Sequence, residues 1–427
     1  MPTSKRSANK TARKKVLLLV ENLSVPADPR VWREAQTLIQ HNYEVSVICP
    51  RGDKRDLEAY SYLDGVHIYR YPLNTEITRA TDYLREYLTA MLRTLGLTFT
   101  VWRRHGFDVI HAANPPDTFF LIGRFYQCFG KKYIFDQHDL APEMFHIKFN
   151  DRMKPLYHAL KFFEYLSYRT ADIVITTNES QKLNAIHRGR CAADKVVVVR
   201  NGPDHVQLHT VPRDLELKMG HPFLLAYIGV MGLQDGVDYV LYALNELINK
   251  RGRRDIGLVL MGDGDQLTHL KQLTEDLLLN EYVHFAGWIG KQELLRYLSV
   301  SDIGLSPDPS NQLNDHSTML KTMEYMAMGL PIVAFDLLET RYSAQEAALY
   351  ATSNNIEEYA NNIELLLADS ELRLKMGAYG HQRVEEELSW LQTRQHLIRA
   401  YEKLFGSAPL VDSTQPLKSS LQPVTGD

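Results

Sequence analysis

The stretch HSTMLKTMEYMAMGLP, residues 316–331, carries Lys321 and Glu324 three positions apart. Its apolar side chains recur at helical spacing, which places these two charged residues together on the opposite face. A helix N-terminus suits a phosphate, because its first N–H groups are free and its dipole end is positive. A lysine one turn in adds charge, and a nearby carboxylate suits the two hydroxyls of a ribose. The alternative is a surface ion pair between the two side chains, worth about 0.2–0.5 kcal/mol.

The same stretch predicts where this helix begins and ends. We expect it to cover residues 317–328, with Ser317 or Asp315 as the N-cap. Gly329, followed by Pro331, is the expected stop, because glycine favours the position after a helix and proline cannot continue one.

A second candidate is His138, which follows the apolar run YIFDQ and precedes Asp139. Parallel sheets bind ligands beyond the carboxyl ends of their strands, so this histidine is either functional or a structural residue at a strand end. Arg33 and Glu34, on a helix predicted over 29–41, either reach the ligand edge or belong to a solvated face.

The motif GDGD, residues 262–265, contains two aspartates in the pattern Asp263-x-Asp265. That pattern is compatible with a divalent metal that holds a diphosphate. A tight turn from a strand into a helix, with Asp265 as its cap, explains the glycines as well. We therefore predict a turn and no metal.

Short β-branched runs alternate with amphipathic stretches along the chain. The expected strands cover residues 16–20, 43–50, 67–73, 108–112, 133–138, 172–177, 196–199, 224–229, 257–262, 283–288, 302–307 and 331–336. The expected helices cover residues 29–41, 79–104, 116–129, 153–170, 236–250, 264–279, 291–300 and 317–328. Nearly all-apolar strands separated by helices indicate parallel sheets covered on both faces. Periodicity breaks at 202–221, so we predict an α/β protein with two doubly wound, Rossmann-like domains that face each other across a cleft.

Composition excludes several classes of protein. The 427 residues carry a net charge of −4, which gives no argument for nucleic acid as a partner. The three cysteines form no CxxC pair, so we expect neither a disulfide framework nor a structural zinc site. Because no apolar run reaches about 18 residues and the N-terminus lacks an apolar signal region, we expect a cytoplasmic protein.

Basic residues gather in three places. Residues 1–15 hold six lysines and arginines and no acid, and they are read as a disordered arm or as a segment attracted to an anionic membrane. The stretches 79–104 and 146–169 mix basic and aromatic residues. Each is either an ordinary core-facing helix or a helix that rests on the inner face of the membrane. Residues 406–427 are rich in Ser and Pro and read as disordered.

Several segments, in order, resemble one enzyme family. KTMEYMAMGLPIVA, preceded by DIGLSP, resembles the nucleotide-sugar-binding segment of family-4 retaining glycosyltransferases of the bacterial polysaccharide type, which have the GT-B fold. ENLSVPADPRVWREAQTL resembles their acceptor-side loop and first helix, YIFDQHDL the strand before the active-site histidine, and VVVVRNGPD the interdomain stretch. YIGVMGLQDGVDYVLYAL, LVLMGDGDQ and VHFAGWIGKQELLRYLSVSDIGLSP resemble the donor-domain strands and turns. Such a series in register is far more specific than one motif.

The resemblance implies roles for particular residues. His138 would contact the transferred sugar, and with Asp139 and Lys321 it forms the expected catalytic set. The expected donor-binding residues are Gly229, Gly232, Gly287, Trp288, Asp315, His316, Ser317, Thr318, Met319, Lys321 and Glu324. The co-substrate would be a nucleoside diphosphate sugar, with no metal and no other cofactor.

The chain departs from the family pattern in two places. Many members carry two glutamates separated by seven residues; the second corresponds to Glu324, but the first falls on His316, beside Asp315. Members also often place Arg and Lys after the first donor-domain strand, where this chain has GVMGLQDG. We therefore expect Lys321 to meet the diphosphate charge, with Arg200 and Arg341 as further candidates.

The resemblance also divides the chain. We expect a basic arm (1–15), an acceptor-binding domain (16–205), a nucleotide-sugar-binding domain (206–390), a C-terminal helix that packs back on the first domain (391–405) and a tail (406–427). The predicted activity is sugar transfer, with retention, to a hydroxyl of a lipid-linked or polysaccharide precursor. The alternatives are a nucleotide-sugar epimerase of similar architecture and a non-catalytic GT-B subunit of a glycan assembly complex.

Overall fold

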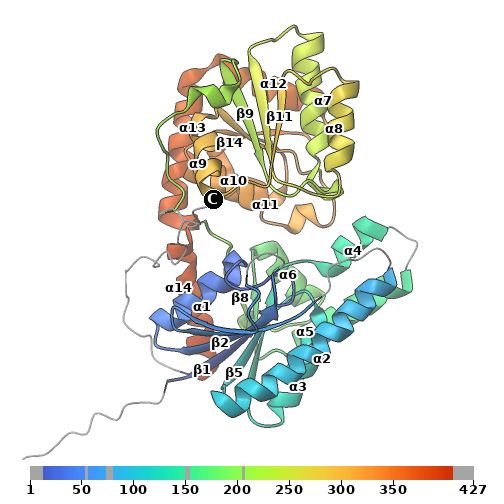
Figure 1. Ribbon diagram of the computed structural model, residues 1–427, viewed down its shortest axis with the longest axis vertical. Coiled ribbons are helices and arrows are strands. Elements are labelled where there is room, and N and C mark those ends of the chain that lie inside the picture. The colour runs from blue at the N-terminus through green and yellow to red at the C-terminus, as the bar shows by residue number, and fades with distance from the viewer. Residues whose placement is uncertain (1–12, 53–55, 74–79, 150–153, 204–206, 407–427) are drawn as a thin grey trace, which may run out of the picture.

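The computed structural model describes residues 13–52, 56–73, 80–149, 154–203 and 207–406, and it contains two domains stacked along its long axis (Figure 1). Each domain is built on one sheet. Most of the predicted basic arm and tail lie outside the described residues. Lys15, expected at the end of that arm, is the first residue of β1, where it pairs with Glu44 in the neighbouring strand.

The first sheet has the strand order β3-β4-β2-β1-β5-β6-β7-β8. Its strands are β1 (Lys15–Leu19), β2 (Glu44–Pro50), β3 (Tyr60–Leu63), β4 (Val66–Tyr71), β5 (Val109–Ala113), β6 (Lys132–Gln137), β7 (Ile173–Thr176) and β8 (Val196–Val198). All neighbours are parallel except β3 and β4, which form an antiparallel edge hairpin. The central strands are apolar because helices cover both faces of the sheet.

The helices of the first domain are α1 (Pro29–Gln40), α2 (Ala80–Arg104), α3 (Phe120–Gln127), α4 (Ala141–Phe149), α5 (Lys154–Thr170) and α6 (Glu179–His187). Helix α1 starts where the sequence requires it. Pro29 takes the first helical position, and the Asp28 carboxylate accepts hydrogen bonds from the backbone N–H groups of Arg30 and Val31.

The second sheet has six parallel strands in the order β11-β10-β9-β12-β13-β14. They are β9 (Phe223–Ile228), β10 (Ile256–Met261), β11 (Val283–Gly287), β12 (Ile303–Ser306), β13 (Ile332–Phe335) and β14 (Ala348–Ala351). The helices around them are α7 (Val237–Asn245), α8 (Leu267–Asp276), α9 (Lys291–Val300), α10 (Leu320–Ala327), α11 (Leu338–Ala344), α12 (Ile356–Ala368) and α13 (Ser370–Arg383). Two Rossmann-like α/β domains are thus confirmed.

The last helix, α14 (Trp390–Phe405), leaves the second domain and lies along the first, beside α1 and β8 (Figure 1). Trp390, Leu397 and Tyr401 belong to the core around β1 and β2. The Trp390 indole N–H donates to Thr37 Oγ1 at 3.1 Å, which ties the helix to α1. The first domain is therefore built from both ends of the chain.

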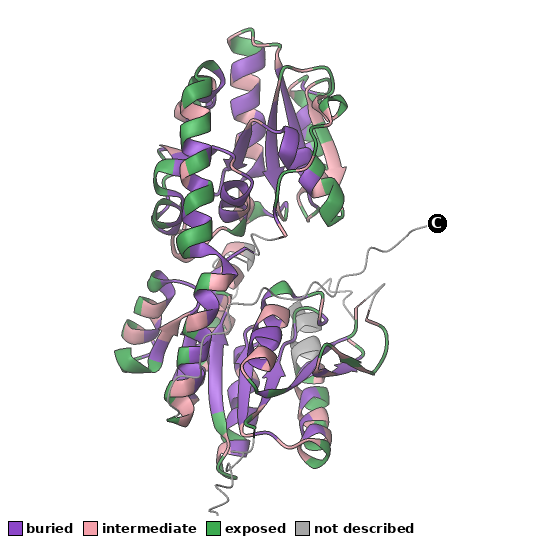
Figure 2. Ribbon diagram, turned by 90° about the vertical axis from the view of Figure 1, so that its left-hand side faces the viewer, coloured by how far each residue is buried: buried purple, intermediate pink, exposed green. Residues whose placement is uncertain are grey.

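The buried residues form a separate core in each domain, centred on the sheets (Figure 2). In the described part of the chain, no helix combines the length and the apolar character that a membrane span requires.

Several elements were not predicted. The edge strands β3 and β14 are only four residues long, and helices α4, α6, α11, α12 and α13 are further additions. Helix α10 starts at Leu320 rather than at residue 317, and its N-cap is Met319, with no side-chain hydrogen bond. Ser317 and Asp315 as caps are therefore wrong, because a 3₁₀ turn (Asn314–His316) and an extended segment precede the helix.

A cluster of buried carboxyl groups lies between α4, α5 and the start of α3. Glu143 and Glu164 both pair with Arg188. Burial raises the pKa of Asp117 to about 8, with nearby Glu164 as a further cause. Burial likewise raises the pKa of Glu164 to about 7, although Arg188 opposes the shift. The folded protein thus holds protons here that the unfolded chain releases near pH 4.

We expect the free energy of unfolding to fall as the pH rises from about 4 to about 8. Asp117 has a raised pKa in the folded state, so its contribution is complete below the unfolded pKa and is lost as the pH passes through the folded pKa. Urea unfolding at several pH values measures this, with Asp117→Asn as the comparison. The variant should show a shallower decline; an identical decline would mean that Asp117 is not the group responsible.

Two backbone segments connect the domains, one that contains Gly202 and one that contains Leu388 and Trp390, and they touch at Gly202. A Cβ at this position would lie 2.2 Å from the carbonyl oxygen of Leu388 and 2.6 Å from the backbone nitrogen of Trp390. We predict that Gly202→Ala destabilises the protein by about 1–3 kcal/mol, because backbone atoms must move. Gly96→Ala, on α2 with no atom within 4 Å of its Cβ, is the control and should be neutral or stabilising. Equal unfolding midpoints for the two variants would contradict the tight crossing.

Candidate active site

Residues that follow strands of both sheets meet where the two domains contact each other. Asn178, just after β7, donates from Nδ2 to the carbonyl oxygen of His316 at 2.9 Å and to Thr318 Oγ1 at 3.1 Å. Glu339 on α11 accepts from the backbone N–H and the hydroxyl of Ser180, at 3.2 and 2.6 Å. The first domain therefore holds the segment before α10 in place.

Lys321 lies in the first turn of α10 and is buried. Its Nζ is 2.6 Å from Asp308 Oδ1 and 3.8 Å from Asp235 Oδ1, and it sits 5.0 Å from the ring centroid of Tyr227. Although burial alone would lower it, these two carboxylates raise the pKa of Lys321. The lysine is thus a charged group held by acids from two other loops, and the alternative of a surface pair with Glu324 is wrong.

Glu324 lies one turn further along the same helix and is half-buried. Burial raises the pKa of its carboxyl group to about 7, while Arg33 and Lys321 act in the opposite direction. Arg33 belongs to α1 in the first domain, so Glu324 faces the other domain. The helix therefore presents a cation near its start and a carboxyl group next to it, as the sequence indicated.

Glycine turns surround Lys321. Gly229, at the end of β9, has a φ of +139°, and a Cβ there would lie 3.4 Å from the Lys321 side chain. In the GDGD motif, a Cβ on Gly262 would lie 1.9 Å from the carbonyl oxygen of Gly229. The motif is therefore a tight turn packed on the turn after β9, as predicted. Asp265 does not cap α8, which has Gln266 at its N-cap and no side-chain cap.

The remaining predicted donor residues are spread around the same edge of the second sheet. Gly287 ends β11, and the next residue, Trp288, is 83% exposed. Ser317 donates its hydroxyl to the carbonyl oxygen of Leu313, and Asp315 accepts from Ser310. The His316 ring is held by the carbonyl oxygen of Gln312. These contacts order the segment before α10.

Arg200 and Arg341, the other candidate cations, are both paired in the structure. Arg200 Nη1 lies 3.3 Å from Glu339 Oε2, and its guanidinium stacks on Tyr342. Arg341 makes two 2.7 Å hydrogen bonds to the Asp336 carboxylate. Like Lys321, each cation already has an acidic partner.

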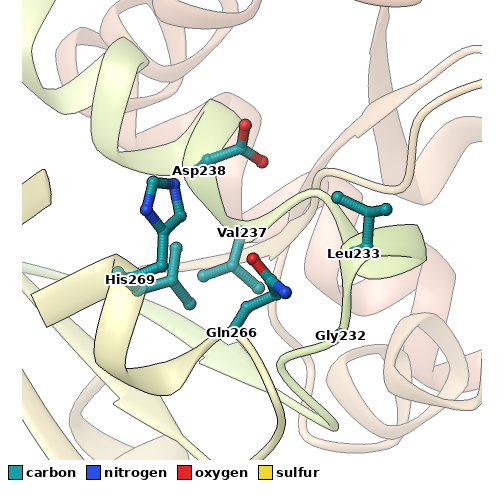
Figure 3. Close-up of a pocket in the computed structure, with 7 residues that line it drawn as sticks. Gly232, Leu233, Val237, Asp238, Gln266 and His269 are labelled. Atoms are coloured by element: carbon teal, nitrogen blue, oxygen red, sulfur yellow. The ribbon is translucent and has the colours of Figure 1, made fainter.

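A small pocket lies between the turn after β9 and the start of α8 (Figure 3). Its lining residues are Gly232, Leu233, Val237, Asp238, Gln266, His269 and Leu270. Of the predicted donor-binding residues only Gly232 lines it, so this pocket is not the predicted diphosphate site.

His138 directly follows β6, as predicted, and is only partly exposed. Its backbone N–H donates to Asn114 Oδ1 at 2.6 Å, and the N–H of Asp139 donates to the same oxygen at 3.1 Å. The ring nitrogen Nε2 lies 2.7 Å from Asp136 and 2.8 Å from Arg30. The Asp139 side chain is exposed.

Glu34, Asp136 and His138 offer ligand atoms within 4.8 Å of one another, which is compatible with a metal ion. The Arg30 guanidinium occupies this cluster, with Nη2 2.8 Å from Asp136 and Nε 3.1 Å from Glu34. Burial would raise the pKa of Asp136, but Arg30 and His138 hold it well below its usual range. An arginine cation already balances this cluster.

Sequence reasoning missed Arg30, Asp136, Asn178, Asp308 and Glu339. Glu34 is buried beside Arg30, so the solvated-face alternative for it is wrong. The pattern DPR at the start of α1 and the aspartate in SPDPS at the end of β12 were the available signals, since charged residues in apolar surroundings at strand and helix ends are seldom left without a partner.

Comparison with known proteins agrees with this geometry. The family "Glycosyltransferase Family 4" matches residues 30–207, and "Glycosyl transferases group 1" matches residues 222–369. A chitobiosyldiphosphodolichol beta-mannosyltransferase of Candida albicans is 20% identical over 90% of this chain and 88% of its own.

Solved structures show the same fold. A sucrose-phosphate synthase of Thermosynechococcus elongatus has a TM-score of 0.75 at 16% identity, over 92% of this chain and 100% of its own. HepE of Anabaena, solved with UDP and glucose, has a TM-score of 0.68 at 15% identity, again over 92% and 100%. With one family matched in each domain, the chain belongs to the family-4, group 1 glycosyltransferases and has their GT-B fold.

Proposed function

We propose that this glycosyltransferase moves a sugar, with retention, from a nucleoside diphosphate sugar to a hydroxyl of a lipid-linked or polysaccharide precursor. The donor would bind to the second domain and the acceptor to the first. The observation that carries the proposal is the start of α10, where a buried lysine and a half-buried glutamate lie beside the segment that the first domain holds. No metal is required in this proposal.

Two similar proteins support the choice of substrates. The Anabaena structure contains UDP and glucose, which are a nucleoside diphosphate and a sugar. The name of the Candida enzyme describes mannosyl transfer to a diphosphodolichol-linked glycan, an acceptor carried on a lipid.

The proposed chemistry follows from charge. As the bond between the sugar and the diphosphate breaks, negative charge grows on the leaving oxygens. The N–H groups at the start of α10 would stabilise this charge together with Lys321, because fixed donors need no rearrangement when it develops. Glu324 would hold the ribose. His138, held by Asn114 and Arg30 in the first domain, would contact the transferred sugar.

The acids around Lys321 set the conditions for donor binding. Asp308 and Asp235 already neutralise the lysine, so a diphosphate must share it with them. Burial raises the pKa of Asp235 to about 6, although Lys321 lowers it. A site with this charge balance would bind the diphosphate more weakly than a site whose lysine had no acidic partner. Contacts to the nucleoside and to the N–H groups of the helix would contribute the rest of the binding free energy.

Lys321→Met should weaken the binding of UDP or GDP, whichever the protein binds, by about 1.5–3 kcal/mol, as for a charge-assisted hydrogen bond. Binding of uridine or guanosine should not change, because the free nucleoside has no phosphate. Calorimetry with each nucleoside and its diphosphate measures this. Lys218→Met, which removes a partly buried lysine–aspartate pair elsewhere in the second domain, is the matched control. Equal losses for nucleoside and diphosphate would place the phosphate site elsewhere.

We also propose that the enzyme works at the inner face of a membrane. Exposed apolar side chains lie on α2, on α3 and just after α3, and we call them the α2–α3 surface: Leu88, Leu92, Phe99, Leu121, Phe125 and Phe129. The rings of Phe99 and Phe125, 5.7 Å apart, join the two helices. Exposed Arg93, Arg103 and Arg124 lie on the same helices. Apolar residues with basic neighbours suit an anionic lipid surface.

Vesicle flotation tests this surface. The protein should float with vesicles that contain anionic lipid at low salt, and less of it should float at high salt. Leu92→Glu with Phe125→Glu should abolish flotation. Leu374→Glu, at a 76% exposed leucine of the second domain, should not. Flotation that survives the double change would rule out the α2–α3 surface.

A further inference from the structure

Arg30 connects three parts of the molecule through one buried side chain. It lies in the first turn of α1, and its Nη2 donates to Asp136 Oδ1 at the end of β6, at 2.8 Å. Its Nη1 donates to the carbonyl oxygen of Val199 at 3.0 Å and to Asn201 Oδ1 at 2.5 Å. Val199 and Asn201 belong to the segment that leaves the first domain for the second. Arg30 therefore joins α1, the sheet edge and the interdomain crossing.

The third nitrogen of the Arg30 guanidinium, Nε, faces His138. Arg30 Nε lies 2.8 Å from His138 Nε2, and Asp136 Oδ2 lies 2.7 Å from the same nitrogen. His138 Nε2 therefore forms a hydrogen bond with either Arg30 or Asp136. The structure shows no partner for His138 Nδ1 within the described part of the chain, and the backbone N–H of His138 is fixed by Asn114. Nδ1 is thus the nitrogen left for a ligand.

A second layer of polar groups supports Asp136. His111 Nε2 lies 3.2 Å from Asp136 Oδ2, and His111 Nδ1 lies 2.8 Å from the hydroxyl of Tyr401 on α14. Glu34 Oε1 is 3.1 Å from Arg30 Nε. All five of these side chains are buried. Such a network has little freedom, because every broken contact would leave a buried polar group unsatisfied.

We propose that Arg30 is a positioning residue that, with Asp136, holds the His138 imidazole by Nε2 and directs Nδ1 toward the transferred sugar. This inference rests on the proposed function, because it concerns how His138 is presented for the reaction. The fixed fork of a guanidinium suits this task, since it reaches the carboxylate, the ring and the linker at once, whereas an ammonium group is a single point charge.

A double-mutant cycle tests whether Arg30 acts through His138. The assay follows nucleoside diphosphate released from UDP-glucose or GDP-mannose. Arg30→Met and His138→Ala should each lower kcat at least tenfold, and the KM for the donor should change less than threefold. In the His138→Ala background, Arg30→Met should lower kcat by less than a further twofold. If the losses in kcat of the two single variants multiply in the double variant, Arg30 is merely structural and the proposal is overturned.

Arg70→Met is the matched control for this cycle. Arg70 is another buried arginine of the first domain, and its guanidinium is held by Asp56, Ser61 and Val25 rather than by His138. Its substitution should change kcat by the same factor with and without His138. If Arg30→Met does not fold, as judged by circular dichroism, Asp136→Asn takes its place in the cycle, and the same non-additivity is expected.

Two shape variants test which ring nitrogen acts. The amide of His138→Asn lies near the place of Nδ1, and the amide of His138→Gln lies near the place of Nε2. If Nδ1 contacts the sugar, the asparagine variant should keep at least fivefold more kcat than the glutamine variant. The reverse order would overturn the proposal.

A readout without turnover separates this inference from the proposed function. In a protein labelled with ¹⁵N-histidine, the Nε2 resonance of His138, identified by its loss in His138→Ala, should move on Arg30→Met but not on Arg70→Met. An unmoved resonance refutes the Arg30 contact even in an active enzyme. If the resonance moves but neither donor is consumed and neither UDP nor GDP raises Tm, the contact stands and the proposed function fails.

Discussion

Two backbone segments connect the domains of this glycosyltransferase, and their contact at Gly202 constrains the positions of the helices and strands on either side. The glycine has no side chain, so the outgoing segment packs directly on the returning segment at Leu388 and Trp390. The backbone N–H of Trp390 donates to the carbonyl oxygen of Pro203 at 3.0 Å. Arg33 donates to the carbonyl oxygen of Gly202, and its guanidinium lies over the Trp390 ring. The segments that connect the domains are thus fixed to the helix that also supports His138.

The candidate donor site contains several charged side chains, but its cations are already paired with acids. Lys321, Arg200 and Arg341 each have a carboxylate partner in the second domain. Binding of a diphosphate then exchanges one anion for another, and the net gain is smaller than the contact itself. If these cations form the proposed donor site, this arrangement would offer selectivity, because a ligand would have to match the positions of several cations before it displaced their acids.

Much of the architecture could be predicted from the sequence, because apolar strands and amphipathic helices carry their own periodicity. The strand before His138 and the helix with Lys321 were placed within a few residues for this reason. The partners of Lys321 could not be predicted, since Asp308 and Asp235 come from loops whose proximity depends on the order β9-β12-β13 in the sheet. Arg30 was missed because its targets lie more than 100 positions away, at 136, 138 and 199.

Helix α14 also has a consequence for the order in which the chain folds as it is made. The core around β1 and β2 contains Leu397 and Tyr401, and Tyr401 closes a buried hydrogen bond to His111, which is 290 positions earlier. Synthesis runs from the N-terminus, so the first domain waits with an open face while the whole second domain emerges from the ribosome. The second domain has all of its strands by residue 351 and can complete its sheet first. The domain that is translated first is therefore the one that is finished last.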